Sequence, residues 1–145
     1  VLWVLNEIGN TVATWMWDAE RGHLKPAQIL TTLPADYTGE STASEIDVSA
    51  DGRFVYCSNR GYDSVAIFGA DAATGLLRPQ GWVPSRGRIP RFIGLAPGGR
   101  FLYGANEQSD TIVSWRVDAG TGALTETGEV VRTPSPVSIT FGRGV

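Results

Sequence analysis

The stretch that decides the fold is residues 54–77, which read Phe-Val-Tyr-Cys-Ser-Asn-Arg-Gly-Tyr-Asp-Ser-Val-Ala-Ile-Phe-Gly-Ala-Asp-Ala-Ala-Thr-Gly-Leu-Leu. Two runs rich in β-branched and aromatic residues, 54–59 and 64–68, flank a short polar turn, which is typical of two paired strands. The second run leads into an Asp-Ala-Ala-Thr-Gly turn. Its acid can accept hydrogen bonds from the turn, and its glycine tolerates a positive φ. The stretch therefore predicts an antiparallel meander.

The same phrase occurs three times in the chain. Its asparagines are spaced by 59 − 6 = 53 and 106 − 59 = 47 residues. Repeats of about 40 to 50 residues that hold several short strands are typical of propeller blades. We therefore predict an all-β fold of β-propeller blades, each with four antiparallel strands, giving about three blades and about twelve strands. The markers that keep these spacings are Asn6, Asn59 and Asn106; Asp18, Asp71 and Asp118; Gly22, Gly75 and Gly122; and Leu24, Leu77 and Leu124.

The repeats predict one partial β-propeller domain over residues 1–145, with repeats at approximately 1–53, 54–100 and 101–145. Closed propellers typically have four to eight blades, so three blades leave edge strands and an apolar flank uncovered. The chain also begins at Val1 inside an apparent strand. We expect either a fragment whose partners are the remaining blades of a longer chain, or self-association through the open edges.

Composition excludes several classes of function. The net charge is −3 with acids and bases interspersed, so no nucleic-acid partner is expected. No apolar stretch approaches the ~20 residues of a membrane helix, so no membrane partner is expected. The one histidine lies in a turn, so we expect neither metal nor cofactor. No signal peptide is recognised, and we expect a cytoplasmic protein. Cys57 lies in an apolar strand run and is predicted to be buried and inert.

Blade topology predicts where polar residues converge. The innermost strand of a blade is antiparallel to its hairpin partner, so the starts of inner strands and the turns after second strands meet at one face, around the axis. The turns that precede Arg53 and Arg100 go to the opposite face, and we interpret these two arginines as solvated surface. The axial face collects Glu45, Asp47 and Arg91 from inner strands, and Glu7, Asn59, Arg60, Asn106 and Glu107 from or beside the turns.

This set of side chains suits an anionic, oxygen-rich substrate. Arginine binds phosphate or carboxylate, a carboxylate can activate water, and guanidinium donors can hold an oxyanion. Arg60 stands where the other repeats carry Glu7 and Glu107, and this change of charge favours a site. The repeated asparagines are explained better by turn formation than by ligand binding. The first repeat is longer by 53 − 47 = 6 residues, around 34–43, and such an insertion often maps to a binding face.

The chain resembles the seven-bladed β-propeller lactonase family, of the 6-phosphogluconolactonase type. The segments that carry the resemblance are 4–12, 39–61, 90–92, 105–112 and the closing 135–141. They span essentially the whole chain but less than half of a family member. The resemblance implies hydrolysis of a sugar-acid lactone such as 6-phosphogluconolactone, with Glu45, Arg60 and Arg91 as site residues. It also implies that residues 135–141 form the C-terminal strand.

One position departs from the family pattern. Many members resemble Glu-Ile-His where this chain has Glu45-Ile46-Asp47. If Asp47 replaces that histidine, it is a weaker base, because an unperturbed Asp pKa is near ~3.9.

We predict a lactone hydrolase in which Glu45 or Asp47 orients water, while Arg60 and Arg91 divide substrate anchoring and oxyanion stabilisation between them. Glu7, Asn59, Asn106 and Glu107 are predicted to contact the substrate. Two alternatives stay open: a non-catalytic propeller that serves as a binding platform, and a cyclase or isomerase that forms lactones. The fragment alone is expected to have little activity.

Overall fold

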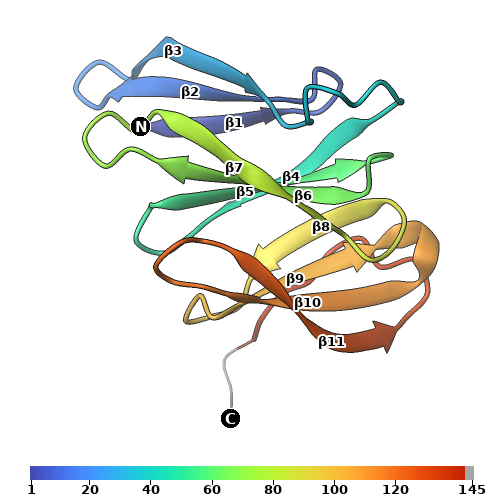
Figure 1. The fold of residues 1–145 in the computed structure, drawn as a ribbon. Coiled ribbons are helices and arrows are strands. Elements are labelled where there is room, and N and C mark those ends of the chain that lie inside the picture. Colours follow the sequence, from blue (N-terminus) through green and yellow to red (C-terminus); the bar gives the residue numbers. More distant parts are fainter. Residues whose placement is uncertain (143–145) are drawn as a thin grey trace.

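The computed structural model describes residues 1–142 and confirms the all-β fold (Figure 1). Within that range the chain forms eleven strands and one short 3-10 helix. The first six strands are β1 (Leu2–Asn6), β2 (Thr11–Asp18), β3 (His23–Thr31), β4 (Thr42–Val48), β5 (Phe54–Arg60) and β6 (Ser64–Ala70). The others are β7 (Leu77–Pro84), β8 (Pro90–Leu95), β9 (Phe101–Asn106), β10 (Thr111–Val117) and β11 (Leu124–Arg132), with the helix η1 (Glu107–Ser109) after β9.

The strands form three antiparallel sheets. The first sheet has the order β1-β2-β3, the second β4-β5-β6-β7 and the third β8-β9-β10-β11. Figure 1 shows the three sheets stacked one against the next, with β4 and β8 as the inner strands of the two complete blades. These inner strands contact each other. Each complete blade therefore runs from an inner strand outward, as the repeats predict.

The core lies between the sheets rather than within any one of them. Successive side chains of a strand point to opposite faces, so β5 sends Phe54 and Tyr56 toward the third sheet and Val55 and Cys57 toward the first. Both faces of β5 are covered, which explains why its first six residues are all buried. Burial raises the pKa of the Cys57 thiol, as expected for an inert packing residue.

The turn ends of the blades are joined by a hydrogen bond that repeats. Trp3 Nε1 donates to the carbonyl oxygen of Gly75 at 3.1 Å, and Tyr56 Oη donates to that of Gly122 at 3.0 Å. The two glycines have positive φ values of 69° and 73°. A Cβ on Gly122 would also overlap the ring of Phe54. The glycine marker is therefore required both by its backbone conformation and by the close approach of the neighbouring blade.

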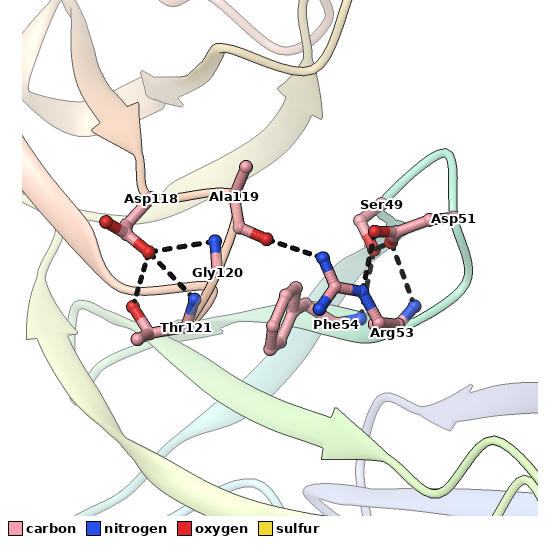
Figure 2. Close-up of polar contacts among 8 residues, drawn as sticks. All are labelled: Ser49, Asp51, Arg53, Phe54, Asp118, Ala119, Gly120 and Thr121. Atoms are coloured by element: carbon pink, nitrogen blue, oxygen red, sulfur yellow. Dashed lines mark hydrogen bonds and ion pairs between the residues drawn. The ribbon is translucent and has the colours of Figure 1, made fainter.

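Arg53 adds a second link at the same end of the molecule (Figure 2). Its Nη2 donates to the carbonyl oxygen of Ala119 at 2.7 Å and its Nε to Asp51 Oδ2 at 2.7 Å, while the guanidinium lies 5.2 Å from the centroid of the Phe54 ring. Arg53 is thus half-exposed but bound to the next blade. The interpretation of Arg53 as surface agrees with this exposure, but the hydrogen bond to another repeat was not predicted.

The predicted C-terminal strand is absent from the part of the chain that the structure describes, where 136–142 form no strand. Phe141 nevertheless packs against Tyr103, with ring centroids 5.5 Å apart. Residues 139–141 also line a hollow beside β4 and β8. A strand there would take its ladder hydrogen bonds from a second strand of its own blade. No such strand occurs among residues 1–142, so the fourth-strand prediction was wrong for this repeat.

Candidate active site

The repeated asparagines hold neighbouring blades together. Asn59 is fully buried, and its Nδ2 donates to the Thr32 carbonyl oxygen at 2.9 Å and its Oδ1 accepts from Thr32 Oγ1 at 2.7 Å. Asn106 is also fully buried and donates to the Ser85 carbonyl oxygen at 3.0 Å. In each pair the asparagine and its partner belong to adjacent sheets. Because both side chains are enclosed, we correct the prediction that Asn59 and Asn106 contact substrate and assign them to blade packing.

A hollow of about 780 Å³ opens at the opposite end of the blades from the turns in Figure 2, and we call it the mouth pocket. The six-residue insertion contributes one wall, residues 39–42. Tyr37 holds this wall in place: its hydroxyl donates to the Glu40 carbonyl oxygen at 2.9 Å, and its ring packs 4.6 Å from that of Tyr62. The other lining residues are Ile8, Asn10, Arg60–Gly61, Ile89 and Glu107–Gln108.

Arg60 is the buried cation of the mouth pocket. It ends β5, and only 14% of its side chain is exposed. One Nη forms an ion pair with the exposed carboxylate of Glu7 and also donates to the Ala43 carbonyl oxygen at 3.2 Å. Its Nε is buried and has no hydrogen-bond partner within residues 1–142. The structure thus brings together two residues, Arg60 and Glu7, that occupy equivalent positions of successive repeats.

Glu107 occupies the third equivalent position and also lines the mouth pocket. It begins η1, and its backbone N–H donates to the Ile89 carbonyl oxygen at 2.9 Å. Glu107 is half-buried. The mouth pocket therefore combines one buried guanidinium with the carboxylate of Glu107.

Glu45 lies in a second hollow of about 450 Å³ between the inner strands β4 and β8, which we call the axial cleft. A β-bulge interrupts β4 between Ala43 and Ile46, so Glu45 leaves the regular ladder. Its backbone N–H instead donates to Ser58 Oγ at 3.0 Å. Bulges redirect side chains next to functional sites. Here Glu45 lines the cleft, and its Oε1 accepts a hydrogen bond from the backbone N–H of Ile46 at 3.3 Å. The cleft is closed on its far side by 139–141.

Asp47 lines the same cleft, but its carboxylate already has two donors. Oδ2 accepts from the backbone N–H of Leu95 at 2.7 Å and Oδ1 from that of Val48 at 2.8 Å. Leu95 belongs to β8, so Asp47 joins the two inner strands. A carboxylate has further lone pairs beyond these two hydrogen bonds. Asp47 therefore lies at the junction of β4 and β8, and its role as a base stays a prediction.

Arg91 lies on the rim of neither hollow. Its side chain is exposed, at a bulge of β8 between Pro90 and Phe92. Ser44 Oγ donates to its carbonyl oxygen at 2.7 Å, which fixes Arg91 beside the bulge that carries Glu45. Over the described range no hydrogen bond or ion pair links the side chains of Glu45, Asp47, Arg60 and Arg91.

The described part of the chain offers no group of three or more His, Cys, Asp or Glu side chains placed to hold a metal ion. No helix in residues 1–142 is long and apolar enough to span a membrane.

Comparison with known proteins identifies the family. The sequence pattern of the family described as "Lactonase, 7-bladed beta-propeller" matches residues 1–141. The chain belongs to this lactonase family.

Solved relatives of this chain share its fold. A protein from Lactobacillus plantarum superposes with a TM-score of 0.90 at 31% identity, over 93% of this chain and 39% of that protein. The periplasmic gluconolactonase of Pseudomonas aeruginosa gives a TM-score of 0.85 at 32% identity, over 91% of this chain and 36% of that one.

The 6-phosphogluconolactonase of Bacillus subtilis is 36% identical over 89 residues, 61% of this chain and 26% of that protein. The chain spans about a quarter of the length of the curated relatives that it matches.

Sequence reasoning missed Asn10, a polar residue of the mouth pocket. Asn10 lines the pocket and donates from Nδ2 to the Ser41 carbonyl oxygen at 2.7 Å, which attaches the insertion to the first sheet. Its equivalents at the same spacings are Asp63 and Asp110. This change of residue type within the repeat is visible in the sequence and is the same kind of signal that marked Arg60.

Proposed function

We propose that the protein is a lactone hydrolase that acts on a sugar-acid lactone such as 6-phosphogluconolactone. The observation that carries this proposal is the position of Glu45. It lies on a bulge of β4 and lines the axial cleft, beside the bulge of β8 that carries the exposed side chain of Arg91. Membership of the lactonase family and the names of two relatives, a gluconolactonase and a 6-phosphogluconolactonase, support the same chemistry.

In the proposed reaction Glu45 accepts a proton from water as the water oxygen attacks the lactone carbonyl carbon. Negative charge develops on the carbonyl oxygen, and Arg91 stabilises it. The ring C–O bond then breaks, and the leaving alkoxide takes the proton back from Glu45. The products are a hydroxyl group and a carboxylic acid, which releases its proton to solvent and becomes a carboxylate. Asp47 takes no part in proton transfer in this scheme.

Arg60 is proposed to position the remainder of the substrate. Thr42, beside Arg60 in the β4–β5 register, is three residues from Glu45 along β4, which corresponds to about 10 Å of strand. This is the length scale of a phosphorylated six-carbon acid. A single substrate can therefore have its lactone carbonyl at Glu45 and its distal end in the mouth pocket.

We also propose that activity requires more blades than these 145 residues supply, because solved relatives that share the fold are more than twice as long. The remaining blades would then complete the channel around Glu45. The cytoplasm stays our prediction for the compartment, although one of the relatives is periplasmic.

The test is hydrolysis of 6-phosphogluconolactone by the full-length protein, measured above the spontaneous rate. Glu45→Gln keeps the shape of the side chain and removes the base, so kcat is expected to fall about 100-fold. Glu129→Gln, an exposed acid on β11, is the matched control and should retain full activity. A wild-type protein that leaves the spontaneous rate unchanged overturns the proposal.

A second candidate is a propeller that binds sugar acids without turnover. The engagement of Asp47 with Leu95, at the position where many members carry histidine, favours this alternative. Calorimetric binding of D-gluconate by a full-length protein that shows no hydrolysis would establish it.

A further inference from the structure

Asn10 differs from its equivalents Asp63 and Asp110 in the direction of its hydrogen bond to the linking segment. Asn10, Asp63 and Asp110 all adopt the left-handed conformation, with φ of 47°, 49° and 55°. Asp63 Oδ1 accepts from the backbone N–H of Ile89 at 2.8 Å, and Asp110 Oδ1 from that of Ser135 at 2.8 Å. In the first repeat the polarity is reversed, because Asn10 donates to a carbonyl oxygen of the linking segment, at Ser41. The Oδ1 atom, which accepts a backbone N–H at Asp63 and Asp110, therefore has no such donor at Asn10.

The Oδ1 atom of Asn10 is buried. Asn10 Oδ1 has no hydrogen-bond partner among the described residues, and neither has Arg60 Nε, a donor. Both residues line the mouth pocket. An unpaired buried polar atom costs about 1 to 3 kcal/mol, so two residues that line the mouth pocket hold an unsatisfied acceptor and an unsatisfied donor.

A hydroxyl group meets both needs, because it donates one hydrogen bond and accepts others. A carboxylate or phosphate satisfies only Arg60, and an ammonium group satisfies only Asn10. Glu107 supplies a further acceptor for a second hydroxyl group, and Ile8 and Ile89 supply apolar surface for carbon atoms. We propose that Asn10 is a specificity-determining residue that, with Arg60, recognises a hydroxyl group on the polyhydroxylated part of the ligand. This inference rests on the proposed function for the identity of the ligand as a sugar acid.

The test compares two acids of equal carbon number, D-gluconate and hexanoate, bound by the full-length protein in calorimetry. Wild type should bind D-gluconate more tightly. Asn10→Gly removes the side chain without strain, since glycine tolerates a positive φ. The D-gluconate to hexanoate affinity ratio should then fall about 3- to 10-fold, the worth of one neutral hydrogen bond. Asp110→Gly makes the same kind of change at an equivalent residue that does not line the pocket, and should leave the ratio unchanged.

The affinity ratio separates loss of hydroxyl recognition from damage to the fold, because damage to the fold weakens the binding of both acids to the same extent. Equal affinity of wild type for the two acids, or a ratio that Asn10→Gly leaves unchanged, overturns the inference. Hydrolysis of the lactone is measured separately. Discrimination between the acids without hydrolysis contradicts the proposed function but supports the role of Asn10.

Discussion

The two ends of the blades treat equivalent positions differently. At the turn end, Trp3 and Tyr56 make the same hydrogen bond to Gly75 and Gly122, so different aromatic residues do one job. At the mouth end, the equivalent residues Glu7 and Arg60 carry opposite charges and form an ion pair with each other. Positions that are repeated at the turn end therefore mark the contacts that join blades. We interpret positions that differ between repeats at the mouth end as candidates for ligand binding.

The asparagines sharpen this comparison, because they lie at the mouth end and yet are constant. Asn59 and Asn106 are buried between sheets, whereas Asn6 in the first sheet is exposed and bonds only to Thr11 among the residues described. Position near a mouth is thus insufficient to indicate a binding role. Variation across the repeats is the better guide, because a residue that packs blades has the same neighbours in each repeat.

The largest expected effect is a loss of stability when the blade junction at the turn end is disrupted. Gly122→Ala places a side chain at φ 73° and against the Phe54 ring, and should lower the free energy of unfolding by about 3 kcal/mol. Gly22→Ala, at φ 64° with no atom within 4 Å of the added Cβ, should cost only about 1 kcal/mol. Urea unfolding measures both. Equal losses would contradict the assignment of Gly122 to the blade junction.

Next in size is the loss of a buried asparagine. Asn59→Ala removes three hydrogen bonds from a fully buried side chain and should cost about 2 kcal/mol. Asn6→Ala, at the exposed equivalent, should change the free energy of unfolding by less than about 0.5 kcal/mol. Thermal and urea unfolding compare the two variants. A large effect of Asn6→Ala would show that exposure does not separate these positions.

A smaller effect is a pH dependence of the free energy of unfolding. It is expected for the junction made by Tyr56 and not for the one made by Trp3. Burial, with lesser contributions from Asp51 and Asp47, raises the pKa of Tyr56 to about 12, above the unfolded value near ~10. Its stabilising contribution is therefore complete below pH ~10 and is lost as the pH rises toward 12. Tyr56→Phe should cost about 1 kcal/mol at pH 8 and abolish this loss in urea titrations. Trp3 does not ionise, so Trp3→Phe should leave the alkaline loss in place.

Much of the fold could be predicted from the sequence because its signals are local. Alternating residues in 54–59, the turn at Asp71 and the constant spacings each depend on nearby residues. The strand predicted at 136–141 failed because its ladder partner would lie outside the described blades, and local pattern does not report a partner. The inter-blade contact of Arg53 was missed for the same reason, since its acceptor at Ala119 lies 66 residues away.

The candidate site was predictable only in outline. The charge change at Arg60 and the insertion at 34–43 both pointed to the mouth pocket. The ion pair with Glu7 and the bond from Leu95 to Asp47 were not predictable, because the partners lie 53 and 48 residues apart. Their pairing depends on how one blade turns against the next. Roles for individual side chains therefore required the structure.

The central claim is that variable mouth residues act on the ligand whereas constant residues hold the blades. Its most direct test is kcat/KM for 6-phosphogluconolactone in the full-length protein with Arg60→Gln, together with the thermal midpoint. Loss of a charged hydrogen bond to substrate should lower kcat/KM about 10- to 100-fold, while the midpoint moves by only a few degrees. Wild-type kcat/KM in Arg60→Gln, or a fall accompanied by a collapse of stability as large as that of Asn59→Ala, would contradict the account.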